Sequence, residues 1–150
     1  MLKQMLKQAA RGLFFFLACA SVASAGIIGV SPVRVTLSNN QKLGSISVSN
    51  QGSVPVTIQM ELMSWTQEGG KDVFTATREI LANPPIFTIP VGESQLLRVG
   101  IRRPPDAQRE KTYRMFLQEL PRPITSDQSG AQMLMRISMP VFVLPEVEVK

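Results

Sequence analysis

Apolar residues alternate with polar ones in six short stretches of this chain, and this alternation constrains the fold more than any other feature. Successive side chains of a β-strand point to opposite faces, so a period of two gives one apolar and one polar face. The clearest stretch is VPVTIQMEL, residues 54–62. The residues on the apolar face of these stretches are Val33, Val35, Leu37, Ile46, Val48, Val54, Val56, Ile58, Met60, Leu62, Leu97, Val99, Ile101, Tyr113, Met115, Leu117, Met133, Met135, Ile137 and Met139.

Segments rich in glycine, proline and asparagine separate these stretches, as is typical of turns. They include SNNQK, NQGS, EGGKD, NPP, PVGES and RRPPDAQ. A helical period is absent outside the N-terminal leader. Six or seven short strands with such breaks predict an all-β fold, an immunoglobulin-like antiparallel β-sandwich of about seven strands. The Cys…Trp…Cys signature of antibody domains is missing.

The N-terminal leader predicts secretion. Three basic residues precede the short apolar run GLFFFLACASVASA, which ends in Ala23-Ser24-Ala25. This is the pattern of a secretory signal peptide, and it is too short for a stable transmembrane anchor. We expect cleavage after Ala25 and no membrane insertion afterwards. A lipoprotein with a modified Cys19 is the alternative, although the preceding FLA fits a lipoprotein signal poorly.

Composition excludes several functions of the mature chain. The whole chain carries a net charge of +5, and removal of the leader leaves 13 basic against 11 acidic residues, a net charge of +2. We therefore expect no nucleic-acid partner. The chain has no histidine, and its single cysteine, Cys19, leaves with the leader. A His/Cys metal site and any Ser-His-Asp or Cys-His mechanism are excluded, so we expect no enzyme, cofactor or metal.

The final alternating run, QMLMRISMPVFVLP at residues 132–145, is unusually rich in methionine. Met133, Met135, Ile137 and Met139 fall on one face of the expected strand, and Arg136 falls on the other. Core strands more often use valine and isoleucine. Methionine is flexible and fills irregular apolar gaps, which suits a surface that accepts changing partners. The alternative interpretation is that this row belongs to the core.

Four segments, taken in order, resemble the N-terminal domain of the periplasmic chaperones that assemble pili and fimbriae in Gram-negative bacteria. They are SPVRVTLS, SISVSNQGSVPVTIQMEL, NPPIFTIPVGESQLLRVGI, and EKTYRMFLQELP followed by RISMPVFVLP. Each match is weak by itself, but together they span about 115 residues behind a signal peptide. The segments YRMFLQELP and MPVFV are closest to the archaic branch of the family.

The resemblance implies a periplasmic protein that binds and stabilises pilus subunits and delivers them to an outer-membrane usher. A subunit of this kind lacks its last strand, and the chaperone lends one of its own in donor-strand complementation. The residues implied to fill the subunit's groove are Met133, Met135 and Ile137, with Met139 as a fourth. Such an exposed strand also leads us to expect self-association.

The resemblance also implies an anchor for the subunit's C-terminal carboxylate. In the family, an arginine of the first strand and a basic residue of the last strand, usually lysine, grip this carboxylate. Arg34 occupies the first position, while Ser138 or Pro140 stands where the lysine is usual. Arg136 is the only base on this strand and is our candidate for the second anchor; a plain surface charge is the alternative for both arginines. Arg98 matches another family arginine, which we interpret as structural.

The expected domain organisation is a signal peptide at 1–25, an immunoglobulin-like chaperone domain at 26–145, and the start of a linker at 146–150. The family has two such domains with the carboxylate grip between them, so we expect that a second domain is missing here. An inactive truncated chaperone is therefore one alternative. Another is a secreted immunoglobulin-like structural protein or a pilus subunit, although many subunits carry a cysteine pair and an N-terminal donor extension.

Overall fold

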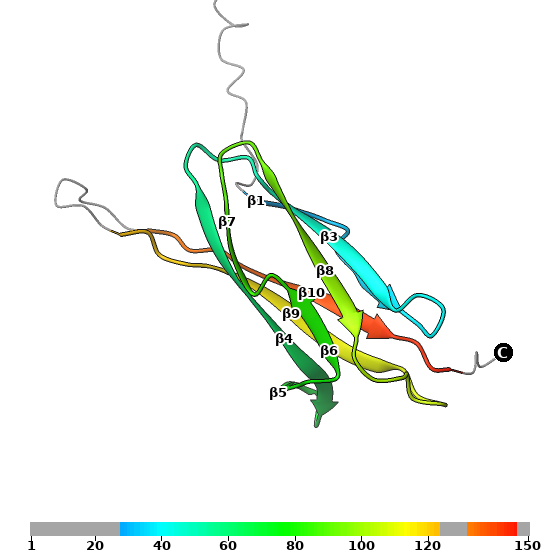
Figure 1. Cartoon of the computed structure of the whole chain (residues 1–150). Helices are drawn as coiled ribbons and strands as arrows, with labels where there is room; N and C mark the ends of the chain where they lie inside the picture. Colours follow the sequence, from blue (N-terminus) through cyan, green and yellow to red (C-terminus); the bar gives the residue numbers. More distant parts are fainter. Residues whose placement is uncertain (1–27, 124–131, 147–150) are drawn as a thin grey trace, which may run out of the picture.

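Ten β-strands form two sheets that pack face to face in a computed structural model of the chain (Figure 1). The structure describes residues 28–123 and 132–146. The expected signal peptide, its cleavage site and residues 147–150 of the expected linker lie outside the described residues. Within the described ranges, no helix has the length and apolar character needed to cross a membrane.

The smaller sheet has four strands, in the spatial order β1-β3-β8-β6. The larger sheet has the order β2-β10-β9-β4-β5, with β7 also paired to β4. All pairs are antiparallel except β2 with β10. This arrangement confirms the predicted immunoglobulin-like β-sandwich. The strands are β1 (Ile28–Ser31), β2 (Val35–Leu37), β3 (Leu43–Asn50), β4 (Val56–Glu68), β5 (Lys71–Ala76), β6 (Ile80–Asn83), β7 (Ile86–Ile89), β8 (Ser94–Ile101), β9 (Lys111–Glu119) and β10 (Arg136–Val143).

The core lies between the two sheets and consists largely of the residues that the alternation predicts. Buried side chains alternate with less buried ones at Ile46, Val48 and Asn50 of β3 and at Leu97 and Val99 of β8, while β9 buries Tyr113 and Met115–Leu117. Burial of this apolar surface is the main driving force for the fold. The predicted inward residues that are buried are Val35, Leu37, Ile46, Val48, Val56, Ile58, Met60, Leu97, Val99, Tyr113, Met115, Leu117 and Met139, with Leu62, Ile101 and Ile137 partly buried against them.

The expectation that Val33 faces inward is wrong, since its side chain is 70% exposed. The first alternating stretch does not form one strand. Only its residues Val35–Leu37 form a strand, β2, which joins the six-stranded sheet, whereas the preceding strand β1 joins the four-stranded sheet. Pro32 has no N–H for a ladder hydrogen bond, and Val33 lies in the link where the chain passes between the sheets. Val54 is also exposed, because it precedes the start of β4.

Four strands lie outside the six alternating stretches, namely β1, β5, β6 and β7. Three of them have four residues, which is too short for a periodic signal. The fourth, β5, is exposed along most of its length and pairs only with the end of β4. These four strands therefore form because they pair with neighbouring strands, and the alternation of the sequence does not predict them.

Asn50 at the end of β3 is a buried polar residue that fixes two turns, with an exposed fraction of 1%. Its Nδ2 donates to the carbonyl oxygens of Val54 at 2.8 Å and Ile89 at 3.0 Å. Its Oδ1 accepts from the backbone N–H of Gly52 at 2.9 Å. One side chain thus joins the turn before β4 to the end of β7, and its buried polar atoms all have partners.

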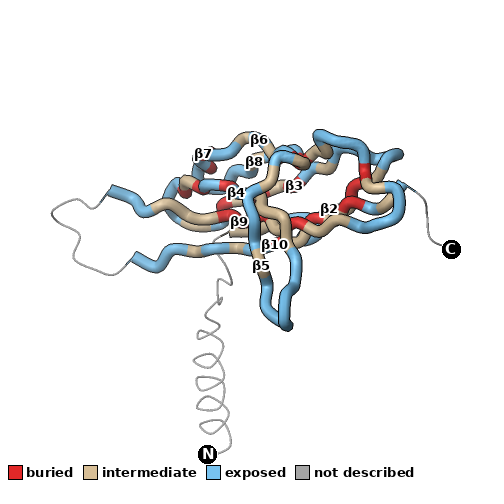
Figure 2. Tube along the Cα trace, turned by 90° about the horizontal axis from the view of Figure 1, so that it is seen from below, coloured by how far each residue is buried: buried red, intermediate tan, exposed pale blue. Residues whose placement is uncertain are grey.

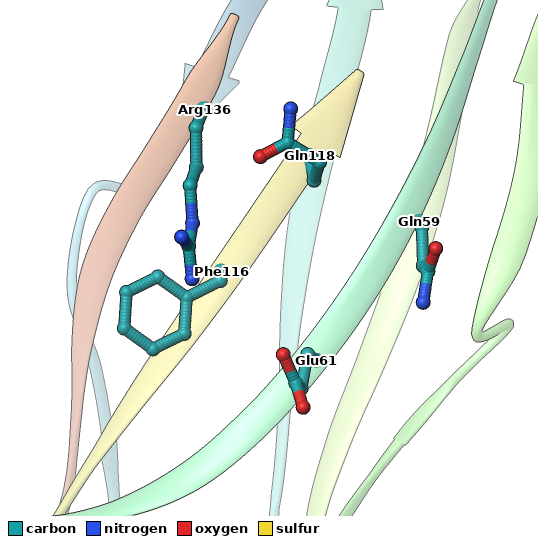
Figure 3. A pocket seen from close by; sticks show the side chains of 5 residues that line it. All are labelled: Gln59, Glu61, Phe116, Gln118 and Arg136. Carbon is teal, nitrogen blue, oxygen red and sulfur yellow. The ribbon is translucent and has the colours of Figure 1, made fainter. Parts of the chain in front are cut away.

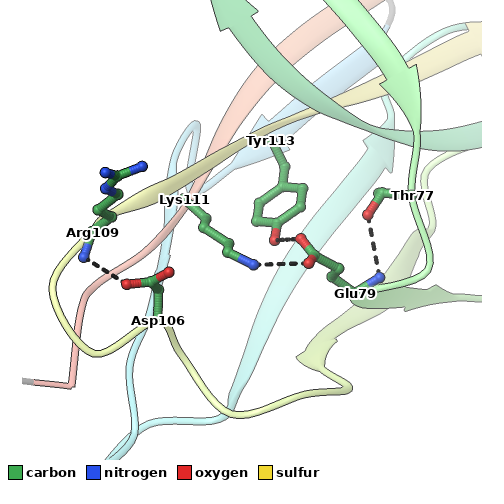
Figure 4. Close-up of polar contacts among 6 residues, drawn as sticks. All are labelled: Thr77, Glu79, Asp106, Arg109, Lys111 and Tyr113. Atoms are coloured by element: carbon green, nitrogen blue, oxygen red, sulfur yellow. Dashed lines mark hydrogen bonds and ion pairs between the residues drawn. The ribbon is translucent and has the colours of Figure 1, made fainter.

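A polar cluster joins the two sheets at the other end of the sandwich (Figure 4). Glu79, just before β6, accepts hydrogen bonds from Lys111 Nζ at 2.8 Å and Tyr113 Oη at 2.7 Å, both on β9. The bonds from Lys111 and then Tyr113 hold the pKa of the Glu79 carboxyl below its usual value. Burial, together with the Glu79 carboxylate, raises the pKa of Tyr113. The cluster therefore serves as a tie between the sheets.

Replacing Asn50 by aspartate should destabilise the domain without changing the volume of its core. An aspartate cannot donate to the Val54 and Ile89 carbonyl groups when it is ionised. We expect a loss of about 2–5 kcal/mol in the free energy of unfolding, since each buried polar group left unpaired costs about 1–3 kcal/mol. Chemical denaturation monitored by circular dichroism measures this change.

The matched control is Asn39→Asp, because Asn39 is an exposed residue of the turn between β2 and β3. This change should leave the unfolding midpoint close to that of the unaltered chain. Equal stability of the two variants would contradict the role given to Asn50.

Candidate functional site

Strand β10 is paired along both edges only at its C-terminal end. Its edge toward β9 is paired from Arg136 to Val143. Its other edge pairs with β2 only from Val141 to Val143. Among the described residues, no strand covers this second edge over 136–140. We call this segment the open edge of β10.

The backbone polar groups at the open edge point away from β9. Glu119 N–H donates to the Met135 carbonyl oxygen at 2.9 Å, so odd-numbered residues direct their backbone groups toward β9. Leu144 N–H donates to Leu37 O at 2.9 Å on the β2 side, which gives even-numbered residues the opposite direction. An antiparallel ladder alternates in this way along a strand. Arg136 and Ser138 thus present an N–H and a C=O at the open edge, and Pro140 presents a C=O alone.

The methionine row begins with Met133 and Met135, which precede β10, and continues into the core along the strand with Ile137 and Met139. Met133 is 95% exposed and Met139 is 2% exposed. Met135 and Ile137 lie between them and are partly buried, with Ile137 packed against the core. Figure 2 shows the same gradient, since the chain next to the 124–131 connection is exposed and the middle of the sandwich is buried. Met139 is therefore a core residue in this structure. The other three residues of the row, Met133, Met135 and Ile137, are accessible to different extents.

Arg34 is exposed and lies just before β2. The register pairs Val35 with Val141, which places Arg34 beside Pro140, at the end of the open edge. Its guanidinium carbon is 5.6 Å from the centre of the Phe142 ring. The ion pair of the described residues joins Lys111 to Glu79, so no described carboxylate is paired with Arg34. Its donors are therefore open to a ligand that reaches this end of β10.

Arg136 lies at the start of β10, on the outer face of the six-stranded sheet. Its guanidinium carbon is 4.5 Å from the centre of the Phe116 ring. It lines a depression of about 220 Å³ together with Gln59, Glu61, Phe116 and Gln118. Figure 3 shows these side chains on three adjacent strands, β10, β9 and β4. The direct cross-strand pairing of Gln59 with Gln118, and of Gln118 with Arg136, brings them together.

The structure does not bring Arg34 and Arg136 to one point. Arg136 and Phe142 are six positions apart on β10, which corresponds to about 20 Å along a strand. The guanidinium of Arg136 turns toward Phe116, whose strand partner is Ser138. That leaves about 13 Å between Ser138 and Phe142 at the usual rise of a strand. In this conformation, the two guanidinium groups are therefore too far apart to grip one carboxylate together.

The outer face of the six-stranded sheet is richer in aromatic contacts than the alternation indicates. Phe116 lies on this outer face, yet it is buried, because Phe74 of β5 covers it in an edge-to-face contact with ring centres 5.3 Å apart. The guanidinium carbon of Arg114 lies 4.1 Å from the ring centre of Trp65 on β4. Only the strand register identifies these neighbours, because the residues are far apart in the sequence. Gln59, Glu61 and Gln118 are likewise brought together by register alone.

Comparison with solved structures finds the same fold in proteins that assemble fimbriae and pili. A chaperone–tip subunit pre-assembly complex of the archaic Csu pili of Acinetobacter baumannii, CsuC–CsuE, has a match of 25% identity and a TM-score of 0.69, covering 81% of this chain and 58% of that one. The Salmonella enterica SafA pilin–SafB chaperone complex has a match of 14% identity and a TM-score of 0.65, covering 86% and 59%. The E. coli chaperone DraB has 21% identity and a TM-score of 0.59, covering 81% and 57%.

This chain thus spans less than two thirds of the length of these solved chains. No protein with a curated description matches it. The model of one family, described as the N-terminal domain of the pili and flagellar-assembly chaperone PapD, matches residues 27–148. That match covers most of the chain and agrees with the sandwich, so the chain belongs to the family of pilus-assembly chaperones through this N-terminal domain.

Proposed function

We propose that this protein is a periplasmic chaperone that captures an unfinished pilus subunit by lending it strand β10. The open edge of β10 over residues 136–140 is the single observation that carries the proposal. An unpaired edge is a template for another strand. A subunit that lacks one strand of its own sandwich presents the complementary edge. Delivery to an outer-membrane usher and a signal peptide at 1–25 belong to the same proposal and rest on the family.

The side chains before the core part of β10 have the properties that a donated strand needs. Met133, Met135 and Ile137 lie on one face and remain accessible to different extents. Full burial of a side chain of this type contributes about 1.5–3 kcal/mol relative to exposure. Met139 is already buried in the chain's own core, so we confine the proposed donor row to the three residues before it. Methionine side chains also adapt to grooves of different shape.

Arg34 is our proposed anchor for the C-terminal carboxylate of the subunit. It lies at the end of the open edge, so a subunit strand that pairs with β10 would end beside it. A guanidinium can grip a carboxylate with two parallel hydrogen bonds. Such an anchor fixes the register, because a slip of one residue turns every donated side chain to the wrong face. The guanidinium of Arg136 lies apart from that of Arg34 in this conformation, so we assign Arg136 no part in the proposed grip.

Two of the matched structures support the class of partner. CsuC is described in a complex with a tip subunit before assembly, and SafB in a complex with the SafA pilin. Because these chaperones share the fold of this chain, a pilus subunit is the partner that we propose. An isolated pilus subunit or structural module is less well supported, because the family that matches is a chaperone family.

Replacing Met135 by threonine should separate binding from folding. Met135 is partly exposed and lies before the core residues of β10, so the thermal midpoint should stay within a few degrees of the unaltered chain. Loss of the apolar side chain from the subunit's groove should reduce capture strongly. The measurement is a thermal melt paired with a pull-down of the subunit encoded beside this chain's gene.

Two matched changes provide the controls for this experiment. Met139→Thr alters the same strand inside the core and should lower the stability by about 2–5 kcal/mol. Met63→Thr alters a partly buried methionine of β4 and should leave capture unchanged. A Met135→Thr variant that melts like Met139→Thr, or that still captures the subunit, would show that the row is not donated.

Replacing Arg34 by alanine should weaken capture and leave the fold intact, because Arg34 is exposed in the free chain. Truncation of one partner of a charge pair that becomes buried in an interface costs about 2–5 kcal/mol. Isothermal titration with the same subunit measures this loss. The effect should disappear for a subunit whose C-terminal carboxylate is amidated.

Arg98→Ala is the control for Arg34, since Arg98 is also an exposed arginine but lies on β8 of the four-stranded sheet. It should bind the subunit like the unaltered chain. Equal affinities of the Arg34 and Arg98 variants would overturn the carboxylate anchor, while the donor strand would still stand on the Met135 result.

A further inference from the structure

Among the described residues, the most exposed methionine, Met133, lies at the start of the donor row. Six of the eight methionines lie in the described residues. Met133 is exposed and Met135 is partly exposed, and both belong to the row. Three others are buried in the core, and the remaining one, Met63, is partly buried on β4. The buried methionines are Met60, Met115 and Met139.

We propose that Met133 and Met135 are sites of reversible oxidation to methionine sulfoxide, and that this modification switches off subunit capture. The inference rests on the donor-strand function proposed above. It extends that function by assigning a chemical modification to the same residues. The oxidant is a two-electron oxygen donor of the peroxide or hypochlorous acid class.

The chemical step balances without any group from the protein other than the thioether. A sulfur lone pair attacks one oxygen of hydrogen peroxide, an S–O bond forms and the O–O bond breaks. The sulfur is oxidised by two electrons, and the peroxide is reduced to water. The reverse step uses a dithiol reductase, in which two thiols become a disulfide and the sulfoxide oxygen leaves as water.

Sulfoxidation at these positions would act on binding and spare the fold. It converts a flexible apolar side chain into a polar one. A polar S–O group placed in an apolar groove without a hydrogen-bond donor is unfavourable. In the free chain the same group remains in solvent at Met133, whose side chain is 95% exposed. The core behind it is protected, because Met139 and Met115 are only 2% and 0% exposed.

The surrounding chain favours this chemistry at methionine. The chain has a single cysteine, Cys19, and none after the expected leader, so thioethers are the only sulfur groups of the mature protein. Ile137, the third residue of the proposed donor row, has no oxidisable group. The modification therefore concentrates at the exposed end of β10, where the strand would meet the subunit.

The test treats the full chain with limiting hydrogen peroxide and maps each methionine by peptide mass spectrometry. We expect Met133 to oxidise first, then Met135, with Met60, Met115 and Met139 last. Affinity for the subunit encoded beside this chain's gene should fall about tenfold or more when both residues are oxidised. The thermal melt should remain cooperative. Treatment with a methionine sulfoxide reductase should restore the affinity.

Two variants locate the effect. In Met133→Leu/Met135→Leu, the affinity after peroxide should equal the variant's own affinity before peroxide, whatever that starting value is. In Met63→Leu, binding should start at the level of the unaltered chain and remain sensitive to peroxide. Undiminished capture by a chain with sulfoxide at both positions would overturn the proposal, as would a double variant that stays equally sensitive.

The outcome also separates this inference from the function on which it rests. If the untreated chain captures the subunit and the oxidised chain captures it equally well, only the proposed switch is contradicted. If the untreated chain captures no subunit encoded in its gene cluster, the donor-strand function is contradicted and the switch falls with it.

Discussion

Every functional feature of this domain depends on the one-sided pairing of β10. The strand is held by β9 along its whole length and by β2 only over its last three residues. Its C-terminal half is thus locked into the sandwich, with Val141 and Val143 in the core. The other half keeps one edge unpaired among the described residues. A strand that is anchored in this way can be lent to another protein without unfolding the lender.

The same asymmetry explains the gradient of the methionine row. Side chains of the row run from Met139 in the core to Met133 in solvent, so in the proposed complex this segment would contribute to two hydrophobic cores, its own and that of the subunit. In the proposed complex, the strand N–H and C=O groups at Arg136 and Ser138 would supply the hydrogen bonds to the subunit. Pro140 lacks an N–H, which avoids an unpaired donor next to the anchor Arg34.

The sequence predicts the fold class and most of the core, because alternation reports directly on which face is buried. It fails at Val33, where the chain changes sheets, and it misses short strands such as β7, which are defined by their neighbours. The alternation along a single strand was enough to predict which of its site residues share a face. The separation of Arg34 from Arg136 was not predictable, because it depends on the register of β2 against β10. The depression lined by Gln59 and Glu61 is likewise a product of register.

Hydrogen exchange at the open edge of β10 tests the central claim most directly. In the free chain, the backbone amides of Arg136 and Ser138 should exchange rapidly, while those of Ile137 and Met139, which point to β9, should be protected. Binding of the pilus subunit should slow exchange at Arg136 and Ser138 and leave the other two unchanged. A complex in which the amides of Arg136 and Ser138 exchange as rapidly as in the free chain would show that the subunit binds elsewhere and that β10 is not the donated strand.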